Sequence, residues 1–254
     1  MVTPKVIFSC KGLSKAFGGL RAVDGVDLAV REGELRALIG PNGAGKSTFF
    51  NLVTGQLRRD KGEVHFNGHR IDGLAPYQVM RRGIARTFQI TSTFRRLTAL
   101  ENVQVALFVH HQRHLNPLAL FIPAHRSMRE RAMFLLEQVG LADSAFKPAG
   151  VLAHGDQKRL ELAIALASAP RMLLLDEPTA GMAPHERREA MSLITRIARE
   201  QGLTLLFTEH DMDVVFGYAE RITVMHQGKV LAEGSPEEVR ANPEVQRVYL
   251  GEHG

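Results

Sequence analysis

Residues 40–48 read Gly40-Pro41-Asn42-Gly43-Ala44-Gly45-Lys46-Ser47-Thr48, a glycine followed by four residues and then Gly-Lys-Ser. Residues 35–39 before it, apolar except for Arg36, predict a short buried strand, and residues 46–54 predict the first turns of a helix. In that setting the glycines let backbone N–H groups approach an anion, and the helix N-terminus adds a partial positive charge. The stretch therefore predicts a phosphate-binding loop, in which Lys46 reaches the β- and γ-phosphates of a nucleotide and the Ser47 hydroxyl ligates Mg²⁺.

Length and composition limit the kinds of protein that could contain this loop. The chain has 254 residues, of which 44% are hydrophobic, so it can bury a substantial core. It contains no apolar run of the roughly 18 residues that a membrane span needs, and its first residues lack the apolar core of a signal peptide. The single cysteine, Cys10, excludes an internal disulfide. We therefore expect a cytosolic protein, whose formal charge of +5 is compatible with phosphate ligands, an anionic membrane surface or nucleic acid.

The order of predicted elements indicates an α/β fold. Residues 6–17 and 22–30, around the turn Gly18-Gly19, predict an N-terminal antiparallel β-layer. Strands then alternate with helices in the second half, as at 172–175, 184–200 and 204–208, which favours a mostly parallel sheet with crossover helices.

Strand signals disappear between these two parts of the chain. Helical patterns occur at 99–109 and 128–139, so we expect a mostly helical subdomain at about 97–164, inserted into a core of 1–96 and 165–254. The segment 110–125 contains an apolar run, and it is either a packed loop or an interface with another protein.

Two carboxylates complete the chemistry that the phosphate loop begins. Asp176 and Glu177 directly follow the apolar residues 172–175, which predict a strand buried on both faces. Asp176 is placed to hold Mg²⁺, and Glu177 to polarise a water molecule that attacks the γ-phosphate.

With these residues in place, the sequence resembles the ATP-binding subunits of ABC transporters over nearly its whole length. Each motif is weak alone, but six in the family's order are specific. They are the Walker A loop at 40–47, the Q-loop Gln89, the signature at 152–159, Walker B at Asp176-Glu177, the D-loop at 180–183 and the switch histidine His210.

The resemblance implies a role for each motif residue. Glu177 and His210 would act on the lytic water and the γ-phosphate, and Gln89 would touch that water or Mg²⁺. Asp176 would join Ser47 in holding Mg²⁺. Phe17 would stack on the adenine. The remaining contacts to ATP would come from the loop residues Gly40, Pro41, Asn42, Gly43, Ala44, Gly45, Lys46, Ser47 and Thr48.

The family's signature residues bind the ATP of a second ATPase subunit, so the resemblance implies a head-to-tail homo- or heterodimer enclosing two ATP molecules. The matching residues are Ala153, His154, Gly155 and Asp156, and the signature turn is expected to open a helix that runs from Asp156 to Ser168. Two positions depart from the family pattern, because Ala153 replaces a serine and Ala183 replaces the aspartate that usually ends the D-loop. The composite site is therefore expected to turn over more slowly, or to leave more of the turnover to the other site of a heterodimer.

Within the family, the chain resembles the larger of the two ATPases of branched-chain amino-acid importers. The resemblance rests on residues 83–89, the insertion at 110–125, His154, residues 208–212 and the ending 248–251. It implies ATP and Mg²⁺ as cofactors, and a position on the inner face of the cell membrane. The implied partners are transmembrane permease subunits, a second ATPase and, indirectly, a solute-binding protein, with no nucleic acid.

ATPases of urea or amide import and of lipopolysaccharide export share several of these features. A non-transport ABC switch protein on ribosomes or DNA is a more distant alternative.

Overall fold

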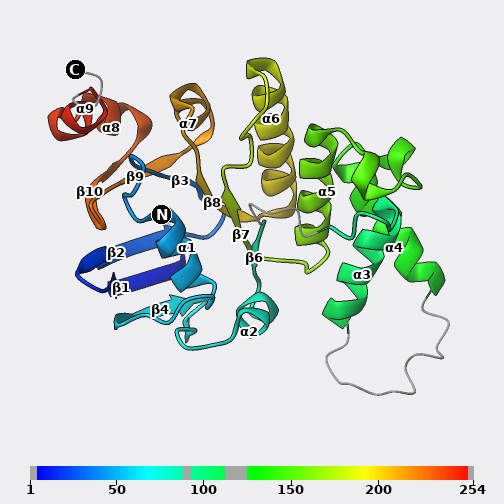
Figure 1. Cartoon of the computed structure of the whole chain (residues 1–254), viewed down its shortest axis with the longest axis horizontal. Helices are drawn as coiled ribbons and strands as arrows, with labels where there is room; N and C mark the ends of the chain where they lie inside the picture. The colour runs from blue at the N-terminus through cyan, green and yellow to red at the C-terminus, as the bar shows by residue number, and fades with distance from the viewer. Residues whose placement is uncertain (1–4, 88–92, 112–124, 251–254) are drawn as a thin grey trace. The chain divides into compact units, whose positions relative to one another are not determined.

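The computed structural model describes residues 5–87, 93–111 and 125–250, which form two compact units. One unit comprises residues 1–84 together with 171–254, and the other comprises residues 85–170 (Figure 1). Gln89 and most of the segment 110–125 lie outside the described residues.

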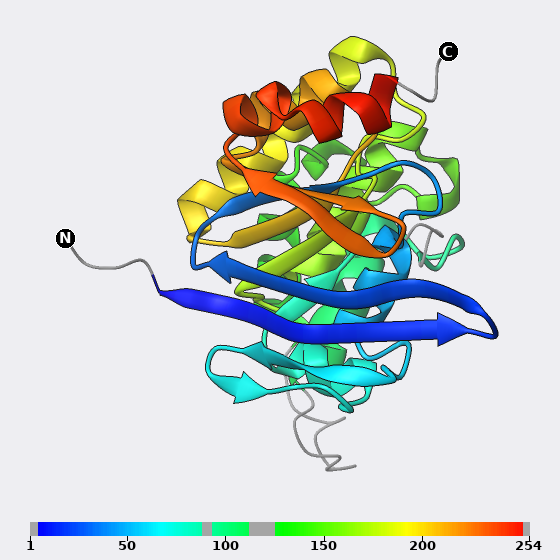
Figure 2. The same cartoon turned by 90° about the vertical axis from the view of Figure 1, so that its left-hand side faces the viewer.

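An antiparallel sheet of four strands opens the first unit. Its order is β2-β1-β4-β5, and its two longest strands, β1 and β2, run side by side in Figure 2. The strands are β1 (Val6–Phe17), β2 (Leu20–Arg31), β4 (Lys61–Phe66) and β5 (His69–Arg70). Gly18, at φ 57°, turns the chain between Phe17 and Leu20, which face each other across the hairpin. The predicted β-layer and its turn are confirmed.

The second sheet has six strands in the order β10-β9-β3-β8-β7-β6. They are β3 (Leu35–Ile39), β6 (Ile84–Arg86), β7 (Met172–Asp176), β8 (Thr204–Thr208), β9 (Arg221–His226) and β10 (Lys229–Gly234). The pairs β3–β8, β3–β9 and β7–β8 are parallel, and every residue of β3, β7 and β8 is buried. This burial explains their largely apolar sequences, and the parallel pairing of neighbours places the carboxyl ends of β3, β7 and β8 together.

Helix α1 (Lys46–Val53) packs in the core that joins the two sheets. Its Phe49 and Phe50 are fully buried, and the Phe49 ring lies edge-on to Phe8 of β1 at a centroid distance of 6.5 Å. The same cluster includes Leu174 of β7 and Leu206 of β8. The phosphate loop is therefore followed by a helix that is fixed between two sheets.

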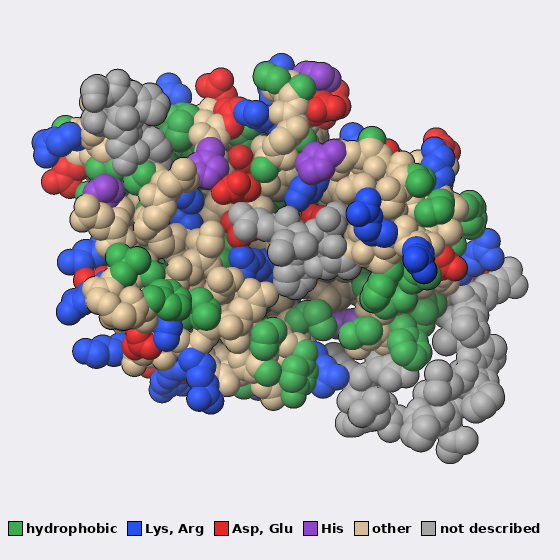
Figure 3. All heavy atoms as spheres, in the orientation of Figure 1, with side chains coloured by type: hydrophobic (Ala, Val, Ile, Leu, Met, Phe, Trp, Pro, Cys, Tyr) green, Lys and Arg blue, Asp and Glu red, His purple; other side chains and the backbone are tan. Residues whose placement is uncertain are grey.

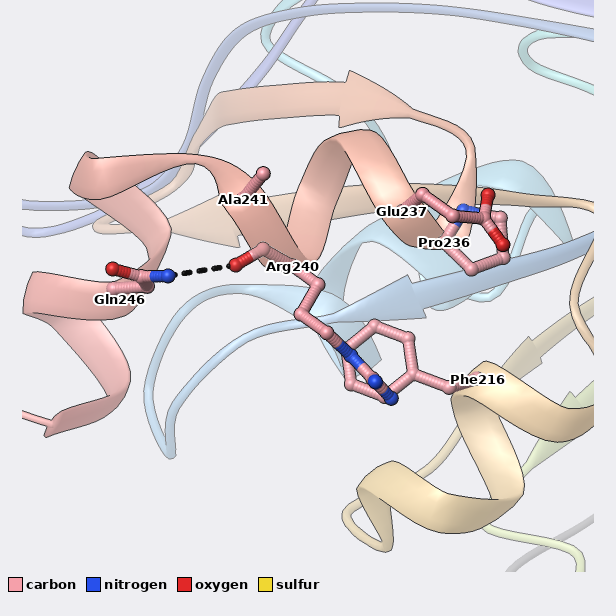
Figure 4. A pocket seen from close by; sticks show the side chains of 6 residues that line it. All are labelled: Phe216, Pro236, Glu237, Arg240, Ala241 and Gln246. Atoms are coloured by element: carbon pink, nitrogen blue, oxygen red, sulfur yellow. Dashed lines mark hydrogen bonds between the residues drawn. The ribbon is translucent and has the colours of Figure 1, made fainter.

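The other helices of this unit are α2 (Pro76–Arg81), α6 (Pro184–Gln201), α7 (Met212–Tyr218), α8 (Pro236–Ala241) and α9 (Pro243–Leu250). In the C-terminal part, the Arg240 guanidinium of α8 lies over the Phe216 ring of α7 at 4.3 Å, and Gln246 of α9 donates to the Arg240 carbonyl oxygen (Figure 4). No helix of the described residues combines the length and apolar content needed to cross a bilayer.

The second unit consists mainly of three mutually contacting helices, α3 (Ala99–His111), α4 (His125–Gln138) and α5 (His154–Leu166), with short 3-10 turns at Ala142–Ser144 and Ala149–Val151. Its core contains Val103, Leu135 and Leu160, one from each helix. Helix α5 begins at His154, two residues before the start that the sequence indicated. The Ala153 backbone is extended, and its carbonyl accepts from the N–H of Gln157, so the first turn already includes residues 154–156.

Candidate active site

The expected phosphate loop connects β3 to α1. Gly43 and Gly45 have φ values of 79° and 102°, which other residues rarely adopt. A Cβ atom on Gly40 or Gly45 would collide with a backbone carbonyl oxygen, of Met225 and Ala22 respectively. The glycines therefore allow a close-packed loop, while Asn42 and Ser47 remain exposed to a ligand.

Lys46 is folded back onto this loop. Its Nζ donates to the carbonyl oxygens of Gly40 at 2.5 Å and Pro41 at 3.1 Å, and the residue is only 8% exposed. Burial lowers the pKa of Lys46, and the charges of Glu177 and Asp176 oppose that shift. The ammonium group is thus held at the loop, within the field of both carboxylates.

The β9–β10 turn supports the loop from a distant part of the sequence. The Gly228 N–H donates to the Ala44 carbonyl at 3.0 Å, and the Gly228 carbonyl accepts from the Asp24 N–H at 2.8 Å. Gly228 has φ 79°, and a Cβ there would press on the Arg21 and Ala22 backbone. One glycine therefore links the phosphate loop to the β1–β2 hairpin.

Asp176 ends β7 and is buried, with 4% of its surface exposed. The Thr208 hydroxyl, at the end of the neighbouring strand β8, donates to Asp176 Oδ1 at 2.9 Å. This hydrogen bond fixes one carboxylate oxygen at the edge of the sheet where β3 enters the phosphate loop.

Glu177 and His210 form a contact at the same edge. His210 Nε2 lies 2.8 Å from Glu177 Oε1, a hydrogen bond in which the imidazole donates to the carboxylate. Glu177 has φ 50°, and its N–H donates to the hydroxyl and carbonyl oxygens of Thr208 at 3.1 and 3.2 Å. The side chains remain accessible, at 27% for Glu177 and 49% for His210.

Two further acids hold the segments that carry these residues. Buried Glu209 accepts from the N–H and hydroxyl of Thr179 at 2.9 and 2.7 Å. Asp211 caps α7 by accepting from the N–H groups of Asp213 and Val214, and it pairs with Arg187 of α6 at 2.6 Å. That ion pair lowers the pKa of Asp211.

Phe17 lies at the end of β1 beside the hairpin turn, with 48% of its surface exposed. Its ring is available for stacking, which suits the flat face of a nucleobase.

The signature residues open α5 in the other unit. Ala153 is the N-cap residue and supplies no side-chain hydrogen bond, whereas the Gln157 side chain donates to the Leu152 carbonyl at 2.9 Å. Ala153 and His154 are exposed, and a Cβ on Gly155 would meet nothing within 4 Å. The exposed helix start offers backbone N–H groups to an anion.

The donor set of the first unit fits a magnesium nucleotide. Mg²⁺ takes oxygen ligands and usually binds through one or two protein groups plus phosphate oxygens. Ser47 and Asp176 supply such oxygens, and Lys46 supplies a cation for phosphate. Among the residues that the structure describes, no group of three or more His, Cys, Asp or Glu side chains could hold a metal ion by itself. A cation at this site would therefore depend on the nucleotide for further ligands.

Comparison with known families decides the class of protein. A family model described as "ABC transporter" matches residues 23–180, from β2 through the phosphate loop to just beyond Glu177. The chain belongs to the ABC transporter ATP-binding family. It is an ATPase with an ABC cassette fold, as the sequence predicted. A second model, "Branched-chain amino acid ATP-binding cassette transporter", matches residues 229–254 of this ABC ATPase.

Curated relatives of this ABC ATPase extend over nearly its whole length. It is 42% identical over 254 residues to the high-affinity branched-chain amino acid transport ATP-binding protein BraF of Pseudomonas aeruginosa, covering 97% of this chain and 98% of BraF. It is 43% identical over 250 residues to the corresponding LivG protein of Salmonella typhimurium, with the same coverage.

Solved ABC cassettes share the fold. A nucleotide-free ATP-binding cassette is 34% identical, with a TM-score of 0.85 over 96% of this chain and 98% of that one. A cassette in its ADP conformation is also 34% identical, with a TM-score of 0.86 over 97% and 99%. A dimeric cassette bound to ADP and phosphate is 28% identical, with a TM-score of 0.78 over 91% and 99%.

The D-loop leads into α6 of this ABC ATPase. Met182 is buried, and Ala183 is the N-cap residue, followed by Pro184 at the first helical position. The Glu186 carboxylate accepts from the Ala183 N–H at 2.8 Å, which compensates for an N-cap residue without a polar side chain. The Q-loop position Gln89 lies outside the described residues.

Sequence reasoning assigned no role to three residues that organise the site, Thr208, Glu209 and Arg187. Thr208 and Glu209 carry a detectable signal, because they are polar residues that directly follow the buried apolar residues 205–207 of β8. Arg187 carries no such signal, since its contact to Asp211 joins residues 24 positions apart.

Proposed function

We propose that this chain powers a membrane importer of branched-chain amino acids by hydrolysing ATP in the site around Lys46, Asp176, Glu177 and His210. The observation that carries the catalytic assignment is the 2.8 Å contact between Glu177 and His210, at the strand ends beside the phosphate loop. The names of BraF and LivG, together with the C-terminal family match, support the substrate class.

In this proposal the Glu177 carboxylate polarises the attacking water, and the His210 imidazole fixes the orientation of that carboxylate. A positioned base of this kind accelerates a reaction by about 10²–10⁴-fold. Lys46 exchanges carbonyl partners for phosphate oxygens and stabilises the charge of the phosphoryl group. Bound Mg²⁺, held by Ser47 and Asp176, would neutralise charge on the β- and γ-phosphates.

The proposed active unit is a head-to-tail dimer, in which Ala153, His154, Gly155 and Asp156 of one subunit bind the ATP of the other. The similar cassette whose solved structure is a dimer bound to ADP and phosphate supports a dimeric active unit. Because Ala153 lacks a hydroxyl, the phosphate contacts from this signature would come from backbone N–H groups. A second ATPase with a more typical signature would compensate for that loss.

An exposed apolar surface on α3 and α4 supports a protein partner for the helical unit. Four hydrophobic side chains there, at 36–53% exposure, belong to Val105, Phe108, Val109 and Phe134. Hydrophobic side chains gather over these helices in Figure 3. Exposed apolar clusters of this kind are typical of interaction sites. The proposed partners are transmembrane permease subunits, which this surface would contact on the cytoplasmic side of the membrane. A solute-binding protein would deliver the substrate to those permeases.

The importer assignment is tested by purifying the tagged chain from gently solubilised membranes and identifying its partners, then measuring uptake of radiolabelled leucine by cells that lack the chain. Two permeases, a second ATPase and lost leucine uptake are expected. If the chain co-purified with permeases but leucine uptake were unchanged, the chain would be a transport ATPase for another substrate. The urea importers and the lipopolysaccharide exporters would then be the systems to test. Recovery with ribosomes or DNA alone would contradict a role in transport.

The catalytic assignment is tested by Glu177→Gln in the assembled complex. The amide cannot act as a base, so ATP turnover is expected to fall about 100-fold or more while ATP binding persists. Phosphate release and ATP affinity are measured on the same preparation, with Glu189→Gln, at an exposed glutamate of α6, as the control. Unchanged turnover in Glu177→Gln would refute the proposed base.

A further inference from the structure

We propose that Lys15 and Asp60 form a clamp that positions the Phe17 ring for the nucleotide base. The inference rests on the proposed function, because it assumes that Phe17 stacks on the base of bound ATP. Neither Lys15 nor Asp60 belongs to the sequence motifs that identified the site.

The Lys15 ammonium covers the Phe17 ring. Its Nζ lies 5.6 Å from the ring centroid, and the two residues are two positions apart on β1. The Lys15 side chain is only 18% exposed, whereas Phe17 is 48% exposed. A cation beside an aromatic ring is attracted to its π-electrons, so Lys15 restrains the ring while much of its surface remains open for stacking.

Asp60 fixes the three residues that precede Phe17. Its Oδ1 accepts from Lys15 Nζ at 2.8 Å, and its Oδ2 accepts from the Ala16 N–H at 2.7 Å. The Asp60 N–H in turn donates to the Ser14 carbonyl at 2.9 Å. One residue of the α1–β4 connection therefore holds both the strand end that carries Phe17 and the ammonium group at its ring.

The charges of the clamp keep it intact at neutral pH. The hydrogen bond from Lys15 is the largest cause of the lowered pKa of Asp60, and the Ala16 N–H adds to it. Asp60 thus remains an anion, and Lys15 remains localised instead of extending into solvent. A ring held in this way loses less rotational freedom when a base stacks on it, which strengthens binding of the base.

The test compares ligands with and without a base. Calorimetry of the full chain is carried out with Mg·ADP and with Mg·pyrophosphate. Pyrophosphate reports on phosphate binding alone, and the difference between the two affinities reports on binding of the nucleoside. Lys15→Met is expected to weaken ADP binding about three- to fivefold, the size of an exposed cation–π contact, with pyrophosphate affinity unchanged. Lys15→Arg is expected to restore ADP affinity, because a guanidinium also stacks on aromatic rings and pairs with a carboxylate.

Lys11→Met is the matched control, because Lys11 is an exposed lysine of the same strand. Asp60→Asn is expected to weaken ADP binding as Lys15→Met does, again with pyrophosphate affinity unchanged. Equal ADP affinity for Lys15→Met and Lys11→Met would overturn the clamp. So would a parallel loss of pyrophosphate affinity, because Lys15 would then act on the phosphates.

A double-mutant cycle separates this inference from the proposed function. Lys15→Met added to Phe17→Ala is expected to cause no further loss, because the ring through which Lys15 acts is gone. Additive losses would overturn the clamp while leaving Phe17 as the stacking residue. If Phe17→Ala alone left ADP affinity unchanged, the assignment of Phe17 to the base would fail, and the clamp with it.

Discussion

Glu177 adopts a backbone conformation that is costly for a glutamate. A residue with a side chain at φ 50° raises the free energy of the fold by about 1–3 kcal/mol, and it keeps this conformation only where its surroundings fix it. Thr208 provides that restraint with two hydrogen bonds to the Glu177 N–H, and its hydroxyl also holds Asp176. The Thr208 hydrogen bonds therefore offset the strain at Glu177, and in this conformation the Glu177 carboxylate contacts His210.

Removing the His210 imidazole is expected to lower turnover and to leave nucleotide binding almost unchanged. His210→Ala leaves Glu177 without the partner that orients it, so kcat should fall roughly 100-fold. Steady-state ATPase assays and ADP calorimetry give the two quantities. The control is His185→Ala, an exposed histidine in the first turn of α6. An equal loss in both variants, or a large loss of ADP affinity in His210→Ala alone, would contradict the catalytic role.

Cys10 is expected to be nearly inert in the folded protein. It is 2% exposed, and burial raises the pKa of its thiol from 9.0 to about 12. The reactive thiolate is therefore about a thousandfold scarcer at pH 8 than in the unfolded chain. Dithionitrobenzoate should label the native protein very slowly and the urea-unfolded protein quickly, with Cys10→Ser as the blank. Rapid labelling of the native chain would show that β1 opens easily.

At the scale of elements, the segment that carries His210 is tied to two helices. Asp211 caps α7 through its side chain and pairs with Arg187 of α6, and Arg187 also donates to the Met182 carbonyl in the D-loop. Helix α6, helix α7 and the D-loop are thus linked next to the proposed catalytic pair.

Asp211→Asn is expected to lower the free energy of unfolding only at pH values at which Asp211 is ionised in the original chain. Asparagine keeps the helix cap and loses the ion pair, so the unfolding free energy at pH 7 should fall by about 0.5–1 kcal/mol. Because the pKa of Asp211 is lowered from 3.8 in the folded state, the pair contributes stability above that value. Its contribution is lost as the pH falls through the lowered pKa.

Urea unfolding at a series of pH values from 7 to 3 measures this dependence. The gap between the original chain and Asp211→Asn should shrink with acidification, while Asp213→Asn, which keeps the Arg187 pair, should show little change at pH 7. A gap that stays constant down to pH 3 would mean that the effect does not arise from charge.

Sequence patterns predicted the buried strands and the helices that begin on proline, for physical reasons. Strands β3, β7 and β8 are buried along their whole length, so their apolar runs mark them clearly. The start of α6 was also found, because Pro184 occupies its first position. Helix α5 was misplaced by two residues, since its N-cap is an alanine and sends no capping signal.

The residues of the site also differ in how far the sequence predicts their positions. Walker A, Asp176, Glu177 and His210 follow strands that the sequence reveals, and the structure places them at one sheet edge. Long-range hydrogen bonds, such as the one from Arg187 to Asp211, leave no local pattern in the sequence. Only the folded structure reveals them. The binding and catalytic roles of all these residues stay predictions, as do those of Phe17, Gln89 and the signature residues.

At the scale of the whole molecule, the chain returns to its first unit after the helical one. The sequence placed the insertion at about 97–164, and the compact units divide at residues 85–170. Strand β6, at that boundary, is marked by only three residues, so the apolar pattern gives a weak signal there. Each unit carries one half of the proposed composite site, because the phosphate loop lies in the first and the signature in the second.

ATP is expected to drive dimerisation when hydrolysis is blocked. Glu177→Gln with saturating Mg·ATP should sediment as a dimer, and the same variant with Mg·ADP as a monomer. Adding Lys46→Ala should abolish the ATP effect, because the phosphate contact is lost. A Glu177→Gln chain that binds ATP yet remains monomeric would contradict a homodimer and point to the second ATPase as its obligatory partner.

The Gly228 turn also limits how the chain can vary in length. Hairpin tips are usually where related proteins accept inserted residues and where engineers place epitope tags. Here the N–H and the carbonyl of one glycine are both engaged, by Ala44 on one side and Asp24 on the other. A residue inserted after Gln227 would displace both bonds at once, so this hairpin tip must keep its length.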